Sequence, residues 1–202
     1  MEKEQHRAVV ESFQQGSIIH SINLEEKTAS VVASKAEKDE NIIIPHSTNY
    51  KSAEYVITSI SNYAFEYSEL KSIQFPPDSE IRIIDCEAFK NSTIESITIS
   101  PHLTTIGNAA FSFCHRLETI IIPEISELKT ICEFAFHETI IESLSIPASL
   151  VYLEDGWCES TYNLNEVKVD QSNPMYRCID DKYVIGKSSI ENDDFDVLIF
   201  CS

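Results

Sequence analysis

A short apolar pattern recurs along the chain at nearly even spacing, and this repetition constrains the fold more than any other feature. An apolar residue is followed by two variable positions, a branched apolar residue, one variable position and a further apolar residue. The five copies begin at Leu70, Ile94, Leu117, Ile141 and Leu164. Internal periods of this kind indicate a solenoid, in which each unit buries its apolar side against the next unit.

A second block precedes each copy, with two apolar residues three positions apart and then an Ala-Phe pair. The pairs are Ala64-Phe65, Ala88-Phe89, Ala110-Phe111 and Ala135-Phe136, and the fifth block has Trp157-Cys158 instead. Successive Phe residues are 24, 22 and 25 residues apart, with a further 22 to Cys158. These separations lie within the period of leucine-rich repeats, which is roughly 20–29 residues.

The pattern also predicts local structure. Two branched residues separated by one position point to the same side of a strand, and a strand of this length buries that side only by stacking on neighbours. Phe can fill the space between coils. The fold class is therefore α/β or mainly β. We predict a right-handed leucine-rich-repeat solenoid with a parallel β-sheet on its concave face, short helical or 3-10 turns elsewhere, and β-hairpin caps.

The string from Leu103 to Pro123, LTTIGNAAFSFCHRLETIIIP, closely resembles the BspA-like leucine-rich-repeat family. The resemblance covers roughly residues 55–170, and in the Ala-Phe-x-x-Cys motif only Cys114 fills the cysteine position. BspA-like proteins of protozoan parasites and oral bacteria are often surface proteins linked to adhesion. The resemblance therefore implies a surface protein that binds host or extracellular-matrix partners.

The ends of the chain depart from the repeat, and we divide the sequence into four parts. Residues 1–17 are expected to be a short helix or frayed segment, because Val9, Val10 and Phe13 could share a helix face. Residues 18–54 are expected to form an N-terminal β cap, with a hairpin within 18–33 and a lone strand at 42–45. Residues 55–170 hold five repeats, and residues 171–202 a C-terminal hairpin or cap with a turn at 172–176 and strands at 182–185 and 196–200.

Charge limits the partners. The chain has 15 basic and 33 acidic residues and a formal charge of −18, which disfavours nucleic acid and anionic lipid. No apolar run approaches the roughly 18 residues that span a bilayer, so direct membrane insertion is not expected. The N-terminus has no secretory signal pattern. Localisation stays open between the cell surface, by resemblance, and the cytoplasm.

No motif predicts catalysis, a metal or a cofactor. The six His residues have no common spacing, and the glycine-rich phosphate-binding patterns and nucleophile elbows are absent from the sequence. The acidic segment 191–196 lacks the spacing of a calcium loop, and a solvated loop is favoured. The six Cys residues include no C-x-x-C pair, and small buried side chains of a reduced protein are favoured over disulfides. We therefore predict that the protein is not an enzyme and binds no cofactor.

The variable positions of the five strands are the candidate partner-binding residues. They should form two exposed columns beside an acidic column, and they are Ser72, Gln74, Ser96, Thr98, Thr119, Ile121, Ser143, Ser145, Glu166 and Lys168, with the acidic residues Glu95, Glu118 and Glu142. Short hydroxyl side chains make a flat hydrogen-bonding surface. They also keep an open sheet soluble. The sequence favours neither the binding surface nor the merely soluble surface over the other.

The leading hypothesis is a non-enzymatic module that binds a protein or glycan on this face. The alternative is an intracellular scaffold or a self-associating structural protein, because open solenoid ends and hairpin edges can pair.

Overall fold

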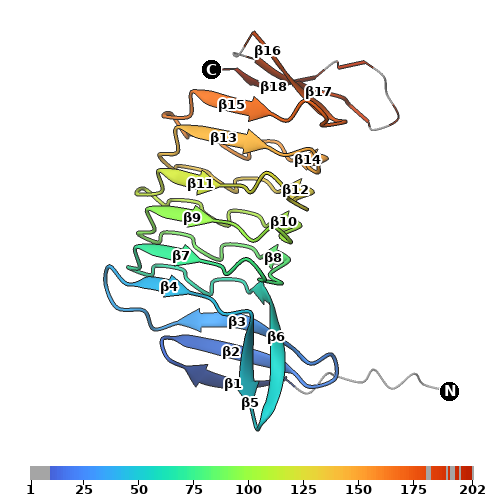
Figure 1. Cartoon of the computed structure of the whole chain (residues 1–202). Coiled ribbons are helices and arrows are strands. Elements are labelled where there is room, and N and C mark those ends of the chain that lie inside the picture. The colour runs from blue at the N-terminus through green and yellow to red at the C-terminus, as the bar shows by residue number, and fades with distance from the viewer. Residues whose placement is uncertain (1–9, 181–182, 190, 192–193, 196, 202) are drawn as a thin grey trace, which may run out of the picture.

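The computed structural model describes residues 11–180, 183–189, 191, 194–195 and 197–199, and the backbone of residues 10, 200 and 201. These residues form a mainly β solenoid of about six turns, stacked one on another between an N-terminal and a C-terminal sheet (Figure 1). The predicted solenoid is confirmed. Its right-handed sense and its concave curvature stay predictions.

The first ladder is the stack of parallel strands built by the apolar repeat. It consists of β4 (Asn41–Ile43), β7 (Ser72–Gln74), β9 (Ser96–Thr98), β11 (Thr119–Ile121), β13 (Ser143–Ile146) and β15 (Glu166–Val169). The paired strands are parallel and in register, so Ile73 lies beside Ile97, and Ile97 beside Ile120. These central side chains are buried, as the two-residue period of a strand requires.

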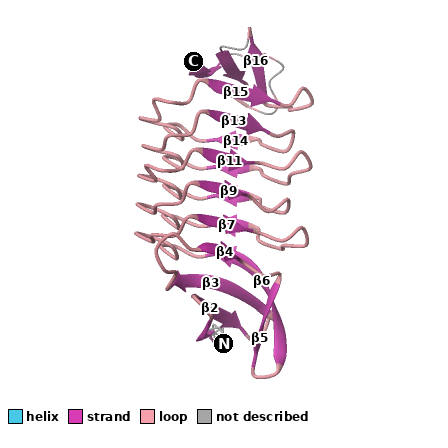
Figure 2. Cartoon of the chain, turned by 60° about the vertical axis from the view of Figure 1, so that its left-hand side comes forward, coloured by secondary structure: helices cyan, strands magenta, loops and turns pink. Residues whose placement is uncertain are grey.

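The first ladder is interrupted once. Hydrogen-bonded pairing runs from β4 through β7 and β9 to β11, and again from β13 to β15, whereas β11 and β13 are neighbours without a ladder between them (Figures 1 and 2). The expectation of one continuous sheet is therefore wrong at this step, although the strands stay parallel. The break coincides with the longest coil, the 25 residues from Phe111 to Phe136.

The second ladder lies on the other side of each coil and is built by the block that precedes Ala-Phe. Its strands are β6 (Ala53–Ile60), β8 (Ile83–Ile84), β10 (Thr105–Ile106), β12 (Thr130–Ile131) and β14 (Tyr152–Leu153). They pair in parallel in chain order. The last residues of β8, β10 and β12, which are Ile84, Ile106 and Ile131, are fully buried in the core.

The Ala-Phe pairs form a third stack between the two ladders. The rings of Phe65, Phe89 and Phe111 lie parallel with centroids 5.0 Å apart, and the ring of Phe136 follows at 5.7 Å. The ring of Trp157 closes the row edge-on at 6.3 Å. This placement confirms that Phe fills the space between coils.

The turns around these pairs are not helical, which corrects the predicted helical or 3-10 turns. Neither an α-helix nor a 3-10 helix occurs among the described residues, and so no helix there is long and apolar enough to cross a membrane. In each complete coil, the residues two before and two after Phe have positive φ, as at Ala109 (51°) and Phe113 (60°). A left-handed residue interrupts helical geometry. The N–H of Phe111 instead donates to the carbonyl oxygen of Ala135 in the next coil, at 2.8 Å.

Gly107 marks a close approach between coils. A Cβ at this position would lie 2.7 Å from the backbone carbon of Asp85 and 2.8 Å from the nitrogen of Cys86. The Gly107 N–H also donates to the Ile84 carbonyl of the preceding coil. Only glycine fits here without displacing the neighbouring coil.

The N-terminal cap is a set of antiparallel strands that continues the second ladder. β1 (Val10–Gln15), β2 (Ile18–Asn23) and β3 (Thr28–Ser34) form a meander, β3 pairs in parallel with β6, and β5 (Ser47–Tyr50) pairs antiparallel with β6. The hairpin predicted within 18–33 is present. The helix predicted within 1–17 is wrong over residues 10–15, because pairing with β2 outweighs the weak helical spacing; residues 1–9, including Val9, lie outside the described part.

Buried His20 gives the cap a testable pH dependence. Its side chain is 1% exposed and stacks on Phe13 with centroids 5.4 Å apart, and its Nδ1 has no hydrogen-bond partner. Burial lowers the pKa of His20, because desolvation disfavours the charged ring. As the pH falls, His20 is therefore protonated in the unfolded chain before it is protonated in the folded protein. The free energy of unfolding decreases as the pH drops through the ordinary histidine pKa of about 6.5.

We expect denaturant unfolding at pH 7.5 and 5.5 to show this loss in the wild type and a smaller loss in His20→Phe. The contribution of a single group is at most about 1.4 kcal/mol per pH unit. Equal losses in both proteins would contradict the assignment to His20.

The C-terminal sheet comprises β16 (Tyr176–Ile179), β17 (Tyr183–Gly186) and β18 (Val197–Cys201), all antiparallel. The two predicted strands are present as β17 and β18, and β16 is additional, beginning at Tyr176 where the predicted turn ends. The predicted first positions, Lys182 and Asp196, lie outside the described residues, as does part of the acidic loop 191–196.

Asn173 and Tyr176 attach this sheet to the last coil. Asn173 is buried; its Nδ2 donates to the carbonyl oxygens of Pro147 and Leu150, and its Oδ1 accepts from the N–H groups of Met175 and Tyr176. The Tyr176 hydroxyl accepts from the Leu153 N–H at the end of the second ladder. The C-terminal sheet thus covers the open end of the solenoid.

Candidate functional site

The variable positions of the first ladder form the two predicted columns. Register pairing places Ser72 beside Ser96 and Ser96 beside Thr119, and it places Thr98 beside Ile121. Beyond the break, the same columns continue as Ser143 and Glu166, and as Ser145 and Lys168. We call the surface made by these columns the strand-lined face.

Two further residues, Asn41 and Ile43, extend the columns at the N-terminal end. They pair with Ser72 and Gln74, and the Ser72 hydroxyl donates to Oδ1 of Asn41 at 2.6 Å. Sequence reasoning placed this segment in the cap, because the apolar position three residues before Ile42 is occupied by Asp39. The alternation that ends in Pro45 is the signal that could have found it.

The strand-lined face is polar, with two exposed exceptions. Ser143, Ser145 and Thr119 are exposed hydroxyl side chains, and Lys168 pairs with Glu166 at 2.9 Å. Ile43 and Ile121, in contrast, are 63% and 51% exposed. Single exposed apolar residues are ordinary on a protein surface, so the exposure of these two residues does not by itself indicate a binding site.

The acidic column lies beside the first column, at the position before each strand. The N–H of Glu95 donates to the carbonyl of Lys71, and that of Glu118 donates to the carbonyl of Glu95, so these residues stack coil on coil. Lys71 reaches Glu95 at 3.5 Å. Among the described residues, no cationic nitrogen lies within 4.0 Å of the carboxylates of Glu118 and Glu142. Negative charge is therefore left uncompensated at the centre of the column.

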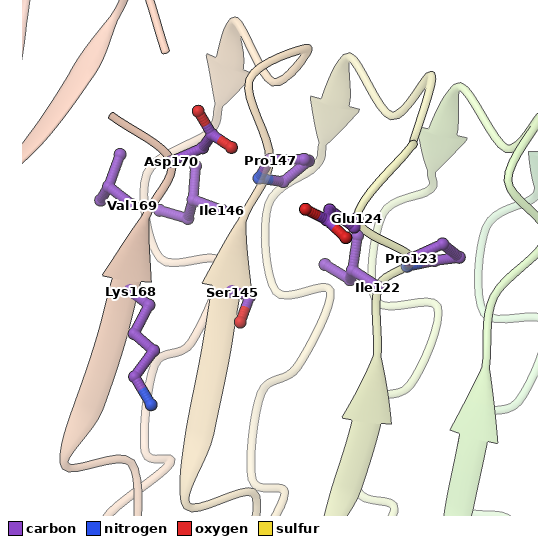
Figure 3. A pocket seen from close by; sticks show the side chains of 9 residues that line it. All are labelled: Ile122, Pro123, Glu124, Ser145, Ile146, Pro147, Lys168, Val169 and Asp170. Carbon is purple, nitrogen blue, oxygen red and sulfur yellow. The ribbon is translucent and has the colours of Figure 1, made fainter. Parts of the chain in front are cut away.

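A pocket of about 330 Å³ lies at the carboxyl ends of three neighbouring strands, next to the ladder break. Ile122, Pro123 and Glu124 come from the turn after β11, Ser145, Ile146 and Pro147 from β13 and the residue after it, and Lys168, Val169 and Asp170 from β15 and the residue after it (Figure 3). Sequence reasoning named only Ser145 and Lys168 of these, because the pocket depends on how the turns of successive coils lie.

A larger hollow, of about 620 Å³, lies away from the strand-lined face. It is formed between β14 and the C-terminal sheet, with Tyr152 and Tyr176 among its lining residues. The Tyr176 hydroxyl in this hollow already bonds to backbone groups of the last coil. We therefore regard this hollow as part of the C-terminal attachment.

The cysteine thiols are suited to packing. The five described residues Cys86, Cys114, Cys132, Cys158 and Cys178 are free. Burial raises the pKa of the Cys114 thiol to about 12, and its Sγ donates to the Phe89 carbonyl at 2.9 Å. Burial also raises the pKa of Cys158 to about 12 and that of Cys132 to about 11. Such thiols carry almost no thiolate at neutral pH.

In the described part of the chain, no group of three or more His, Cys, Asp or Glu side chains is placed to hold a metal ion. The chemistry that the strand-lined face offers is hydrogen bonding, negative charge and a small pocket lined by both apolar and charged residues.

The repeat unit itself decides the family. The sequence profile of the BspA type leucine rich repeat region matches residues 57–177 in six copies, which is more than half of the chain. The chain belongs to the BspA-type leucine-rich-repeat family. The profile finds one copy more than the five predicted from the apolar pattern. A comparison with curated proteins finds no match.

Solved structures agree with the fold. The pneumococcal vaccine antigen PcpA superposes with a TM-score of 0.70 at 23% identity, over 89% of this chain and 55% of that one. A leucine-rich repeat protein from Bacteroides ovatus superposes with a TM-score of 0.69 at 27% identity, over 77% of this chain and 40% of that one. The chain thus spans about half the length of these two structures.

Proposed function

We propose that this BspA-type solenoid is a binding module that holds a protein partner on its strand-lined face. The observation that carries the proposal is the in-register stacking of short side chains along the first ladder, with half-buried Ser72 and Ser96 and exposed Thr119 in one column. Small hydroxyl groups let a partner approach the sheet closely and hydrogen-bond to it. The neighbouring uncompensated carboxylates add electrostatic selectivity for the partner.

The setting we propose for this binding is adhesion to a host or extracellular-matrix protein. The resemblance to BspA-like surface proteins supports this setting, and the polar, extended face suits a macromolecule better than a small molecule. An intracellular protein partner is the alternative, and a glycan would use the same hydroxyl column.

Affinity capture with three immobilised proteins tests the proposal. The first is the wild type. In the second, Ser72, Ser96, Thr119 and Ser143 are all replaced by Lys, which blocks the first column. Each protein is exposed to an extracellular-matrix extract and to a lysate of the cells that produce it, and bound proteins are compared by mass spectrometry.

The third protein is a matched control with four Lys substitutions on the second ladder. They replace the in-register residues Ile83, Thr105, Thr130 and Tyr152. We expect proteins captured by the wild type to be retained by this control and lost from the first-column variant. Proteins that are still captured after the first-column substitutions would refute a role for the strand-lined face. A captured protein that comes from the matrix extract would indicate adhesion, and one that comes from the cell lysate would indicate scaffolding.

A further inference from the structure

The ladder break and the pocket occur at the same place on the strand-lined face. β11 and β13 are neighbours without hydrogen-bonded pairing, and the turn after β11 forms one wall of the pocket. Elsewhere in the first ladder the paired strands are joined in register. The surface is therefore interrupted at this step, where a side chain can enter.

Apolar groups gather around this opening. Ile122, Ile146, Pro147 and Val169 line the pocket with their apolar side chains. Beside it, Ile121 is 51% exposed, and Ile125, in the turn after β11, is 87% exposed. Exposed apolar side chains next to a pocket on a polar face are the arrangement in which a few residues dominate binding energy.

Carboxylates surround the same opening. Glu124 and Asp170 line the pocket and lie at opposite sides of Pro147 in Figure 3, whereas Glu118 and Glu142 lie at the far ends of β11 and β13. The pKa of Asp170 is lowered because the Ser172 hydroxyl and N–H donate to it, so this carboxylate stays ionised at neutral pH. Lys168, the cation that lines the pocket, is already paired with Glu166.

We propose that this opening is the anchor point of the partner: the pocket takes one apolar side chain of an extended polypeptide segment, and Lys or Arg residues flanking that side chain pair with the surrounding carboxylates. The inference rests on the proposed function and names the partner's chemistry. A second copy of the chain is the wrong occupant, because two molecules of charge −18 repel one another at an acidic face.

A phage-displayed library of random dodecapeptides, selected on the wild-type protein, tests the anchor. We expect enriched peptides to contain an apolar residue flanked by Lys or Arg. Their affinities are then measured by fluorescence anisotropy against two variants of the second column, Ser145→Trp and Thr98→Trp. Both residues are exposed, but only Ser145 lines the pocket, so thermal unfolding of the two variants should match the wild type.

Ser145→Trp should weaken binding about tenfold or more, and Thr98→Trp less than about threefold. Glu124→Gln should weaken binding about threefold to tenfold at low salt and reduce its salt dependence, whereas the exposed Glu133→Gln control on the other side of the coil should change neither.

Several outcomes would overturn the anchor. Peptides without basic residues, or no enrichment at all, would do so. Basic peptides that respond to Thr98→Trp but not to Ser145→Trp would also refute it and leave the strand-lined face as the binding surface. A dimer, detected by sedimentation and abolished by Ser145→Trp, would assign the pocket to a second copy instead. Failure of the capture experiment is a separate result, since it concerns the first column and natural partners.

Discussion

Replacing Phe111 with alanine should lower the free energy of unfolding by about 3–5 kcal/mol, the range for removing a fully buried phenylalanine side chain. Phe111 is 0% exposed, and its ring lies between those of Phe89 and Phe136 at 5.0 and 5.7 Å. The substitution removes contacts to both neighbouring coils at once. The central row cannot collapse to fill the cavity, because backbone hydrogen bonds between coils fix their spacing. Equilibrium unfolding in urea measures the effect.

Phe113→Ala is the matched control for this prediction. Phe113 lies two residues further along the same coil, is half-buried, and touches His115 and His137 edge-on rather than stacking in the row. We expect it to cost about 1 kcal/mol or less. Equal costs for the two substitutions would show that the Phe row does not hold the coils together.

Asn173→Ala should destabilise the attachment of the C-terminal sheet by about 2–4 kcal/mol, because it leaves two buried carbonyl oxygens and two N–H groups without their shared partner. The loss should be local. Hydrogen exchange should accelerate in β16 and β17 and in the last coil around Leu150, while amides of β7 and β9 keep their protection.

Asn165→Ala provides the comparison for Asn173. Asn165 is exposed and its Nδ2 makes one hydrogen bond, to the carbonyl of Asn163. Its replacement should change stability by no more than about 0.5 kcal/mol. Unchanged exchange in β16 after Asn173→Ala would mean that Asn173 does not secure the C-terminal sheet.

Structural features that recur in every coil could be predicted from the sequence. The apolar repeat located β7, β9, β11, β13 and β15, and the two-residue alternation within each strand placed one side chain in the core and its neighbours on the face. The Phe spacing gave the third stack. Each of these follows from local pattern alone, because every coil uses the same residues in the same way.

What the sequence could not predict depends on contacts between distant segments. β1 was expected to be helical because Val9, Val10 and Phe13 have helical spacing, yet pairing with β2 makes residues 10–15 a strand. The helical turns failed for a similar reason. The residues two before and after each Phe adopt positive φ, and around Phe111 the backbone N–H groups bond alternately to the next coil and within their own turn, so a continuous helical ladder does not form.

The candidate site shows the same division. The two columns were predicted because they are the variable positions of a regular strand. The ladder break and the pocket were not, because both depend on how the turns of three coils lie beside one another. Asn41 and Ile43 were missed because their strand lacks the first apolar residue of the repeat.

The stacking of parallel strands in register is the claim on which the strand-lined face depends, and nuclear Overhauser effects between backbone protons test it most directly. We predict contacts between the Ile73, Ile97 and Ile120 segments that join an α-proton on one strand to an amide proton on the next, in the staggered order of a parallel ladder. Close α-proton pairs between these segments, which only antiparallel strands make, would contradict the fold and the face together.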